Sequence, residues 1–229
     1  MSLKILSWNI WADGYFDQVS DFLEKSDADI IALQEVTNHN PKRDIVKYLD
    51  ALGYQYAFAP VEKKWDGKIY TDGPAIFSKY KIHKTEVYSL SKTDNRVALR
   101  TDVRVKDKAI HVFSTHLIHT HQQESKLQNE QVTNLVKILP RRDTILMGDF
   151  NATPDSKVIK KISSIFTDTD NKSLPTWSVY KKGCIKCKPQ NIYCKLDYIF
   201  VTKDISFNSF AVGHTKASDH LPIFINVKI

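Results

Sequence analysis

Acids, amides and imidazoles stand at the ends of apolar runs in four parts of this chain. Each run has the character of a buried strand, so these polar side chains would gather where strands give way to loops. They are Asn9, Glu35, Asp149, Asn151, Asp219 and His220. Carboxylate and amide oxygens hold hard cations, and an imidazole can meet the negative charge on a phosphoryl oxygen. The pattern predicts metal-assisted hydrolysis.

Six short motifs carry these residues in a fixed order along the chain. They are Trp8-Asn9, Gln34-Glu35-Val36, Ser114-Thr115-His116-Leu117, Gly148-Asp149-Phe150-Asn151, Leu196-Asp197-Tyr198-Ile199 and Ser218-Asp219-His220. Any one of them is common, whereas six in this order are specific. From residue 3 to residue 228 the chain resembles the endonuclease/exonuclease/phosphatase superfamily of DNase I-like metal-dependent phosphodiesterases. The resemblance implies an α/β, four-layer sandwich of two packed mixed β-sheets flanked by helices.

The resemblance also implies a metal site. Glu35 would be the main ligand of Mg²⁺, Asn9 would contact the metal or the phosphate, and Asp219 would lie beside the metal. Mg²⁺ is the expected cofactor, with Mn²⁺ as a substitute.

Five further roles follow from the resemblance, all of them in catalysis. Asp149 would orient or deprotonate the attacking water, and Asn151 would hold that water and the phosphate. His220 would bind the scissile phosphate, held in its tautomer by Asp197. His116 would offer a second imidazole to the phosphoryl oxygens. The expected reaction is in-line attack of water at phosphorus, where positioning and charge neutralisation supply most of the acceleration.

Two positions depart from one branch of the superfamily. His116 stands where exonuclease III-type abasic endonucleases usually carry tyrosine, and Trp11 stands where they often have aspartate. Both residues resemble the DNase I, sphingomyelinase and tyrosyl-DNA phosphodiesterase side of the superfamily. The motifs therefore predict the reaction type and leave the substrate open.

The positive charge of the chain is concentrated in one stretch. Residues 157–195 contain nine lysines and two acids and so carry a net charge of +7. The formal net charge of the whole chain is also +7. Trp177 and two tyrosines lie among these lysines, so the stretch suits a polyanion with bases to stack on. We expect Trp177 and Arg96 to bind substrate and expect a nucleic acid as partner, DNA rather than RNA. The alternative is a solvated lysine-rich loop that only aids solubility.

The predicted elements support a single domain over residues 1–229. With 42% apolar residues the chain can build one sizeable core, and no linker or repeat divides it. Strict alternation over residues 97–105 predicts an antiparallel strand with one buried face, paired with 110–115. Helices are predicted over 42–52, 122–139 and 155–165, a strand over 73–78, and a polar loop over 62–67. This mixed order favours two sheets packed face to face over a doubly wound parallel sheet.

The three cysteines lie close together as Cys184-x₂-Cys187-x₆-Cys194. Three readings stay open: a structural Zn²⁺ site with a fourth ligand such as His214, a disulfide from Cys184, or free thiols in a reducing cytoplasm. Two histidines shortly after His116, at positions 119 and 121, could suggest a metal cluster, and they are interpreted instead as exposed loop residues.

The leading functional hypothesis is a Mg²⁺-dependent phosphodiesterase that acts on nucleic acid. Alternatives are a tyrosyl-DNA phosphodiesterase, a hydrolase of inositol phosphates or sphingolipid head groups, and a catalytically inactive nucleic-acid-binding module. The first residues form a strand and leave no space for a secretory signal, and no apolar run is long enough to span a membrane. We therefore expect a cytoplasmic monomer.

Overall fold

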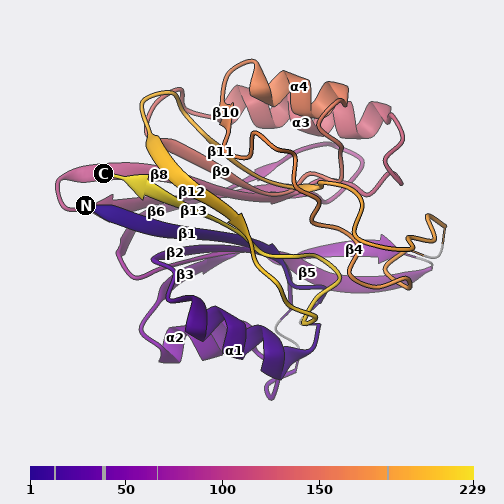
Figure 1. Cartoon of the computed structure of the whole chain (residues 1–229), viewed down its shortest axis with the longest axis horizontal. Helices are drawn as coiled ribbons and strands as arrows, with labels where there is room; N and C mark the ends of the chain where they lie inside the picture. The colour runs from indigo at the N-terminus through magenta and orange to yellow at the C-terminus, as the bar shows by residue number, and fades with distance from the viewer. Residues whose placement is uncertain (13, 38–39, 66, 185) are drawn as a thin grey trace.

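The computed structural model describes residues 1–12, 14–37, 40–65, 67–184 and 186–229. Two β-sheets pack face to face, and helices cover the outer face of each (Figure 1). This four-layer α/β arrangement confirms the fold class predicted from the sequence.

The first sheet has the N-terminal strand near its middle. Its order is β12 (Ser206–Val212), β13 (Ile223–Lys228), β1 (Ser2–Asn9), β2 (Ile30–Val36), β5 (Lys68–Ser78) and β3 (Gln55–Phe58), with β4 (Val61–Trp65) paired to β5. β1 and β2 run parallel and are buried on both faces, which explains their nearly continuous apolar sequences. α1 (Phe16–Ser26) and α2 (Ile45–Ala51) pack their apolar residues on Leu6, Trp8 and Leu33.

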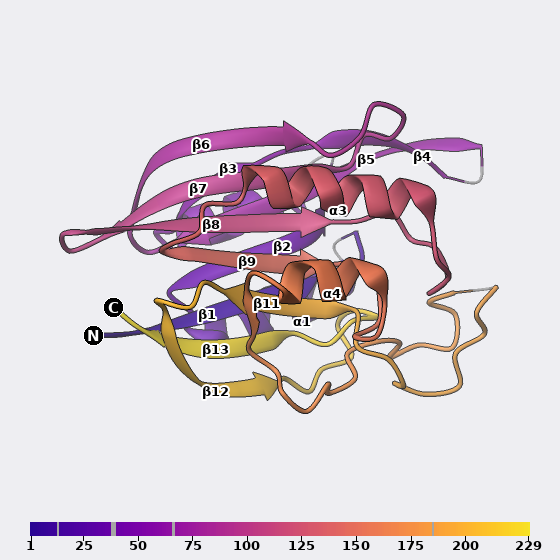
Figure 2. The same ribbon diagram turned by 90° about the horizontal axis from the view of Figure 1, so that it is seen from above.

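The second sheet is built around β8 and β9, which are also parallel. Its order is β10 (Thr167–Asp168), β11 (Asp197–Val201), β9 (Thr144–Asp149), β8 (Lys108–His116), β7 (Val97–Val105) and β6 (Lys81–Ser89). α3 (Lys126–Ile138) and α4 (Lys157–Ser163) lie side by side on its outer face (Figure 2).

The layer between the sheets is apolar and follows the two-residue period of the strands. In β1, Leu3 and Ile5 face the other sheet, whereas Leu6 and Trp8 face the helices. Each fully buried aliphatic side chain of this layer contributes about 1.5–3 kcal/mol relative to an exposed one. This packing fixes the strand register and so holds the strand ends in place.

The strand ends that carry polar motifs meet at one edge of the molecule. Asn9 is the last residue of β1, and His116 and Asp149 are paired last residues of β8 and β9. Asp197, the first residue of the antiparallel β11, pairs with Asp149 on its other side. Backbone hydrogen bonding alone therefore brings three of these four residues together in one sheet.

Three helices begin later than predicted because a capping side chain fixes each start. The Asp44 carboxylate accepts the backbone N–H groups of Val46 and Lys47, so α2 starts at Ile45 rather than at residue 42. Ser125 and Ser156 cap α3 and α4 in the same way, so the predicted starts at 122 and 155 were also wrong.

Several strands were missed or shortened by the sequence analysis. β6 and β12 are edge strands with largely exposed side chains, so they lack an apolar signal. β5 starts at Lys68 and not at Gly73, because its first half pairs with the charged strand β4. The polar loop predicted over 62–67 is therefore largely a hairpin, with residue 66 outside the described part of the chain.

The two ends of the chain are neighbours in the first sheet. β1 pairs antiparallel with β13, so that Ser2 lies opposite Lys228, at the end of β1 remote from Asn9 (Figure 1). Within the described residues, every helix is too short or too polar to cross a bilayer.

Candidate active site

Asp149 is the centre of the polar cluster at the shared strand edge. Asn9 reaches across from the first sheet and donates its Nδ2 to Asp149 Oδ2 at 3.1 Å. The backbone N–H of Asn151 donates to Oδ1 at 2.8 Å. Nε2 atoms of two histidines approach Oδ2, at 3.4 Å from His116 and 3.6 Å from His220. Burial, reinforced by the nearby Asp197 carboxylate, raises the pKa of Asp149 to about 7.

His220 is held in place by the carboxylate of Asp197, which is held in turn by Thr176. Its Nδ1 lies 2.8 Å from Asp197 Oδ2, and the same oxygen accepts the Thr176 hydroxyl at 2.6 Å. Burial opposes a charge on this imidazole, but the carboxylates of Asp197, Asp149 and Asp219 outweigh it and raise the pKa of His220 well above its usual value. These carboxylates therefore favour the cationic form of this histidine, whose Nε2 is directed at the centre.

His116 has the opposite character, although it lies in the same cluster. Burial, with the positive charges of Arg96 and Lys63, holds its pKa well below the usual value. Asn151 donates Nδ2 to His116 Nε2 at 3.0 Å, so the ring proton belongs on Nδ1, which lies 3.9 Å from Glu35 Oε1. The site thus pairs a neutral imidazole with a charged one.

Glu35 and Asp219 bring two more carboxylates to the cluster. Asn9 Nδ2 donates to Glu35 Oε1 at 3.1 Å, and Trp177 Nε1 donates to Asp219 Oδ2 at 3.3 Å. Burial raises the pKa of both acids. Glu35 has a φ of 58° at an irregularity in the β2–β5 pairing, which turns its side chain out of the strand. Several carboxylates around one amide form a donor set of the kind that a hard divalent cation takes.

Two residues beside Glu35 were missed by the sequence analysis. Lys63 and Asp72 form an ion pair across the β4–β5 hairpin. The Asp72 charge contributes to the raised pKa of Glu35, and burial lowers the pKa of Lys63. Neither residue ends an apolar run or belongs to one of the six motifs, so no local signal distinguishes them. Thr176 was missed for the same reason.

The two predicted substrate-binding residues have structural contacts in this arrangement. Arg96 donates Nη1 to the backbone carbonyl of His116 at 3.4 Å and is half-buried. Trp177 is only 2% exposed, so its ring offers no free face for stacking on a base. That expectation was wrong, because Trp177 packs beneath the site and donates to Asp219 instead.

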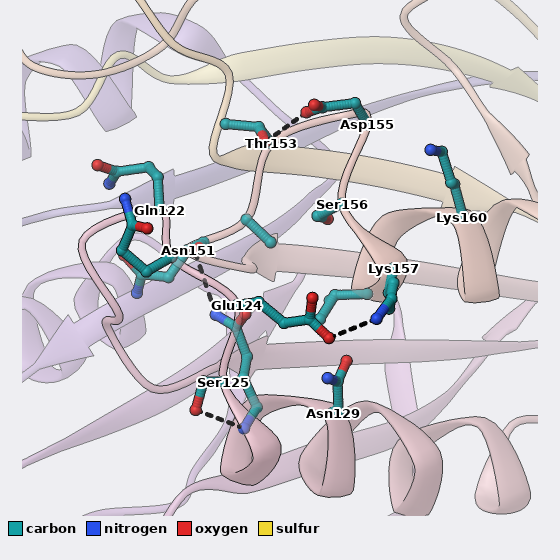
Figure 3. A pocket seen from close by; sticks show the side chains of 14 residues that line it. Gln122, Glu124, Ser125, Asn129, Asn151, Thr153, Asp155, Ser156, Lys157 and Lys160 are labelled. Carbon is teal, nitrogen blue, oxygen red and sulfur yellow. Dashed lines mark hydrogen bonds and ion pairs between the residues drawn. The ribbon is translucent and has the colours of Figure 1, made fainter.

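Two grooves each include one residue of this region. One, of about 340 Å³, starts at Asn151 and runs between the capped starts of α3 and α4, past Lys157 and Lys160 (Figure 3). The other, of about 200 Å³, lies next to Asp72 and includes the ring of Tyr70, which is 46% exposed.

The lysine-rich stretch is not uniformly available to a ligand. Lys195 is buried and forms ion pairs with both acids of the stretch, Asp168 and Asp170. The other eight lysines are exposed. The net positive charge of the stretch is therefore almost entirely exposed to solvent.

The structure divides the three cysteines. Cys184 and Cys187 are joined in a disulfide, whereas Cys194 is a buried free thiol whose Sγ faces the Trp177 carbonyl. His119 and His121 are partly buried against Cys184 and Cys187, so their interpretation as exposed loop residues was wrong. The predicted zinc site of Cys184, Cys187 and Cys194 is therefore corrected. Cys184 and Cys187 lie close to His119 and His121, whereas Cys194 lies outside this group of four side chains and His214 is exposed elsewhere.

Two packed mixed sheets with an acid–amide–imidazole cluster at their common edge define the class of DNase I-like phosphoester hydrolases. Comparison with family models gives the particular family. The model of the Endonuclease/Exonuclease/phosphatase family matches residues 6–220, and the chain belongs to this family. No curated protein matches the chain significantly.

Solved structures with the same fold come from proteins described by different activities. An endonuclease/exonuclease/phosphatase from Beutenbergia cavernae is 19% identical, with 100% of this chain and 72% of that chain covered, at a TM-score of 0.79. ANGEL2, a 2′,3′-cyclic phosphatase, is 17% identical (99% and 95% covered; TM-score 0.73). A mannosyl-6-phosphatase from Bacteroides thetaiotaomicron is 19% identical (99% and 100% covered; TM-score 0.69).

Proposed function

We propose that this protein is a Mg²⁺-dependent phosphodiesterase that hydrolyses nucleic acid, DNA in preference to RNA. The observation that carries the substrate class is a groove that starts at Asn151 and is lined by the exposed Lys157 and Lys160, together with a second groove that holds the exposed ring of Tyr70 beside Asp72. A phosphodiester has chain on both sides of the scissile phosphorus and can contact both grooves. A phosphomonoester extends on one side only.

Asp149 supplies the base in this proposal. A carboxylate with a pKa of about 7 is ionised in a large fraction of molecules at neutral pH and is basic enough to take a proton from water. The backbone N–H of Asn151 leaves Oδ2 as the oxygen that faces the histidines and Asn9. The attacking water would therefore lie beside Oδ2.

The two histidines have different tasks because their charges differ. Cationic His220 stabilises the negative charge that grows on the phosphoryl oxygens, and Asp197 and Thr176 keep its Nε2 pointed at them. Neutral His116 accepts a hydrogen bond from Asn151 and thereby fixes that amide. Electrostatic stabilisation of this kind requires no rearrangement during the reaction.

Glu35, Asn9 and Asp219 would hold the Mg²⁺ ion, with Mn²⁺ as a substitute. Their oxygen atoms suit a hard cation, and burial raises the pKa of the two acids, so a nearby positive charge would favour their ionised forms. A bound divalent cation supplies Lewis-acid polarisation of the phosphoryl group. Lys63 and Asp72 border this position and neutralise one another there.

The proposal is tested with one end-labelled panel, assayed with Mg²⁺ and with EDTA. The panel holds single- and double-stranded DNA, RNA, abasic duplex and 5′-phosphotyrosyl DNA, with a 2′,3′-cyclic nucleotide, an inositol phosphate and a sugar phosphate as small substrates. Cleavage of a DNA lane that needs both Mg²⁺ and Asp149 supports the proposal. Turnover of small phosphoesters alone would replace it with a phosphatase, and preference for the phosphotyrosyl lane would assign DNA-end processing.

A pair of matched variants tests the groove. Lys157→Gln with Lys160→Gln removes two positive charges beside Asn151, and Lys81→Gln with Lys106→Gln removes two at the far ends of β6 and β7. If the backbone of the substrate lies in the groove, only the first pair should raise KM for DNA and reduce its salt dependence. Equal effects of the two pairs would contradict binding in this groove.

A further inference from the structure

Four metal-ligating side chains from two loops meet next to the active site. His119 and His121 follow β8, and Cys184 and Cys187 belong to the lysine-rich stretch more than sixty residues later. One ligand atom of each lies within 4.8 Å of those of the others. We refer to these four residues as the Cys–His cluster.

The orientation of His119 is fixed from the active-site side. Asn151 Nδ2 donates to the Leu117 carbonyl at 3.0 Å, so its Oδ1 must be the atom that faces His119 Nδ1 at 2.8 Å. That oxygen only accepts, and the hydrogen is therefore on Nδ1 of His119. Nε2 of a neutral His119 carries the lone pair, and it points at His121 Nδ1 from 3.0 Å.

Hydrogen bonding alone does not account for the position of His121. Its Nδ1 faces His119 Nε2 at 3.0 Å, Cys187 Sγ at 3.2 Å and Cys184 Sγ at 3.4 Å. A ring nitrogen carries either one proton or one lone pair in the ring plane, so it can serve one of these three neighbours. A cation at the centre of the four atoms would serve all of them.

The donor atoms of the cluster suit tetrahedral zinc. Zn–N and Zn–S bonds of about 2.0 and 2.3 Å separate two nitrogen ligands by about 3.3 Å and nitrogen from sulfur by about 3.6 Å. The three separations that involve His121 Nδ1, from 3.0 to 3.4 Å, approach these values, and all four donor atoms lie within 4.8 Å of one another. The backbone N–H of Cys187 donates to Cys184 Sγ at 2.9 Å, which favours a thiolate there. Two thiolates and two imidazoles select Zn²⁺ among the common divalent ions.

We propose that the reduced protein binds one structural Zn²⁺ through His119 Nε2, His121 Nδ1, Cys184 Sγ and Cys187 Sγ, and that this ion fastens the lysine-rich stretch beside Asn151. Binding converts two thiols to thiolates and releases two protons. The disulfide uses the same two sulfurs, so the two states exclude one another. A phosphine reductant supplies the two electrons that cleave the disulfide, and water supplies the two thiol hydrogens and the oxygen of the phosphine oxide that forms.

The proposed ion differs in purpose from the Mg²⁺ of the proposed reaction. All four zinc positions are filled by protein atoms, so no ligand position is open to water or substrate. Its link to catalysis is indirect: His119 donates to Asn151, and Asn151 donates to His116. His119 is therefore a positioning residue that acts through the amide.

The test uses the full chain, purified with a phosphine reductant and without added metal, followed by elemental analysis and Co²⁺ substitution. We expect about one zinc per chain, and after exchange the visible bands of tetrahedral Co²⁺ together with thiolate-to-Co²⁺ charge transfer. Cys187→Ser and His121→Asn should each lose the zinc and the charge-transfer band. Thermal melting confirms that a variant is folded.

Two matched controls separate this site from others in the chain. Cys194→Ser removes the cysteine outside the cluster and should retain zinc, and Asp149→Asn disables the proposed Mg²⁺-dependent reaction and should retain the charge-transfer band. Reduced wild type without zinc and without Co²⁺–thiolate absorption would overturn the proposal, as would equal loss in Cys194→Ser and Cys187→Ser. Neither result depends on any enzymatic activity.

Discussion

The active centre around Asp149 and the Cys–His cluster are neighbours that are held together in different ways. In the active centre, Asn9, His116, Asp149 and Asp197 are terminal residues of buried strands, and ladder hydrogen bonds set their spacing. In the cluster, all four ligands come from loops. The comparison teaches that the first site is preorganised by the core, whereas the second depends on contacts between two loops that the proposed metal would strengthen.

Asp149→Asn tests the active centre, and it should have the largest effect of the substitutions considered. The amide keeps the hydrogen-bonding shape but cannot take a proton from water, so turnover should fall by about 10²–10⁴-fold. Single-turnover cleavage of the best substrate, alongside circular dichroism, measures this. A folded variant that retains a tenth of wild-type turnover would remove Asp149 from the role of base.

Asp197→Asn should have the next largest effect, because it acts through His220. Loss of a buried carboxylate that orients an imidazole typically costs about 10–100-fold. The variant also removes one of the charges that raise the pKa of His220, so the imidazole loses its proton at lower pH. The alkaline limb of the pH–rate profile should therefore move to lower pH; an unmoved limb would show that His220 does not act as a cation.

Removing the cross-link should loosen the loop without loosening the strands. Lys181, Lys182 and Lys186 are exposed near the two cysteines, so trypsin can report on this segment. Reduction with chelation should speed cleavage there by about tenfold, because the loop retains few other contacts to oppose opening. Exposed lysines beside β-strands, such as Lys81, are the internal control and should be cut no faster.

The smallest expected effect is on stability, and it depends on pH. The unfolded chain has Asp149 ionised above about pH 4, whereas the folded, metal-free chain keeps it protonated up to about pH 7. Unfolding in this window releases a proton, so the contribution of Asp149 to stability falls as pH rises through it. In EDTA, Asp149→Asn should therefore gain a few degrees in Tm over wild type at pH 8 relative to pH 5. An unchanged Tm difference would contradict the raised pKa.

The same contrast explains what could be predicted from the sequence. The runs before Asn9, His116 and Asp149 are apolar because the strands are buried on both faces, and the polar residue that ends each run is therefore visible. The family resemblance then implies a role for the residue at each of these strand ends. Asp197 and His220 were recognisable in the same way, since each borders an apolar strand.

The parts that could not be predicted depend on contacts that no local pattern encodes. Lys63 and Asp72 meet only because two charged segments pair as β4 and β5. His119 and His121 resemble ordinary polar loop residues until the segment with Cys184 folds back on them. Trp177 has the same aromatic signal whether exposed or buried, and only the packing decides that it supports Asp219.

The first and last strands of the chain lie side by side in the first sheet, so their outer ends are close together. Because Ser2 and Lys228 are paired neighbours, a short flexible linker could join the termini without disturbing β1 or β13. New ends could then be opened at the exposed turn around Lys106 and Asp107, between β7 and β8 and away from the His116 end of the strand. Such a circular permutant should fold to the same architecture, and a domain fused next to Ser2 or Lys228 would lie a full strand length from Asn9.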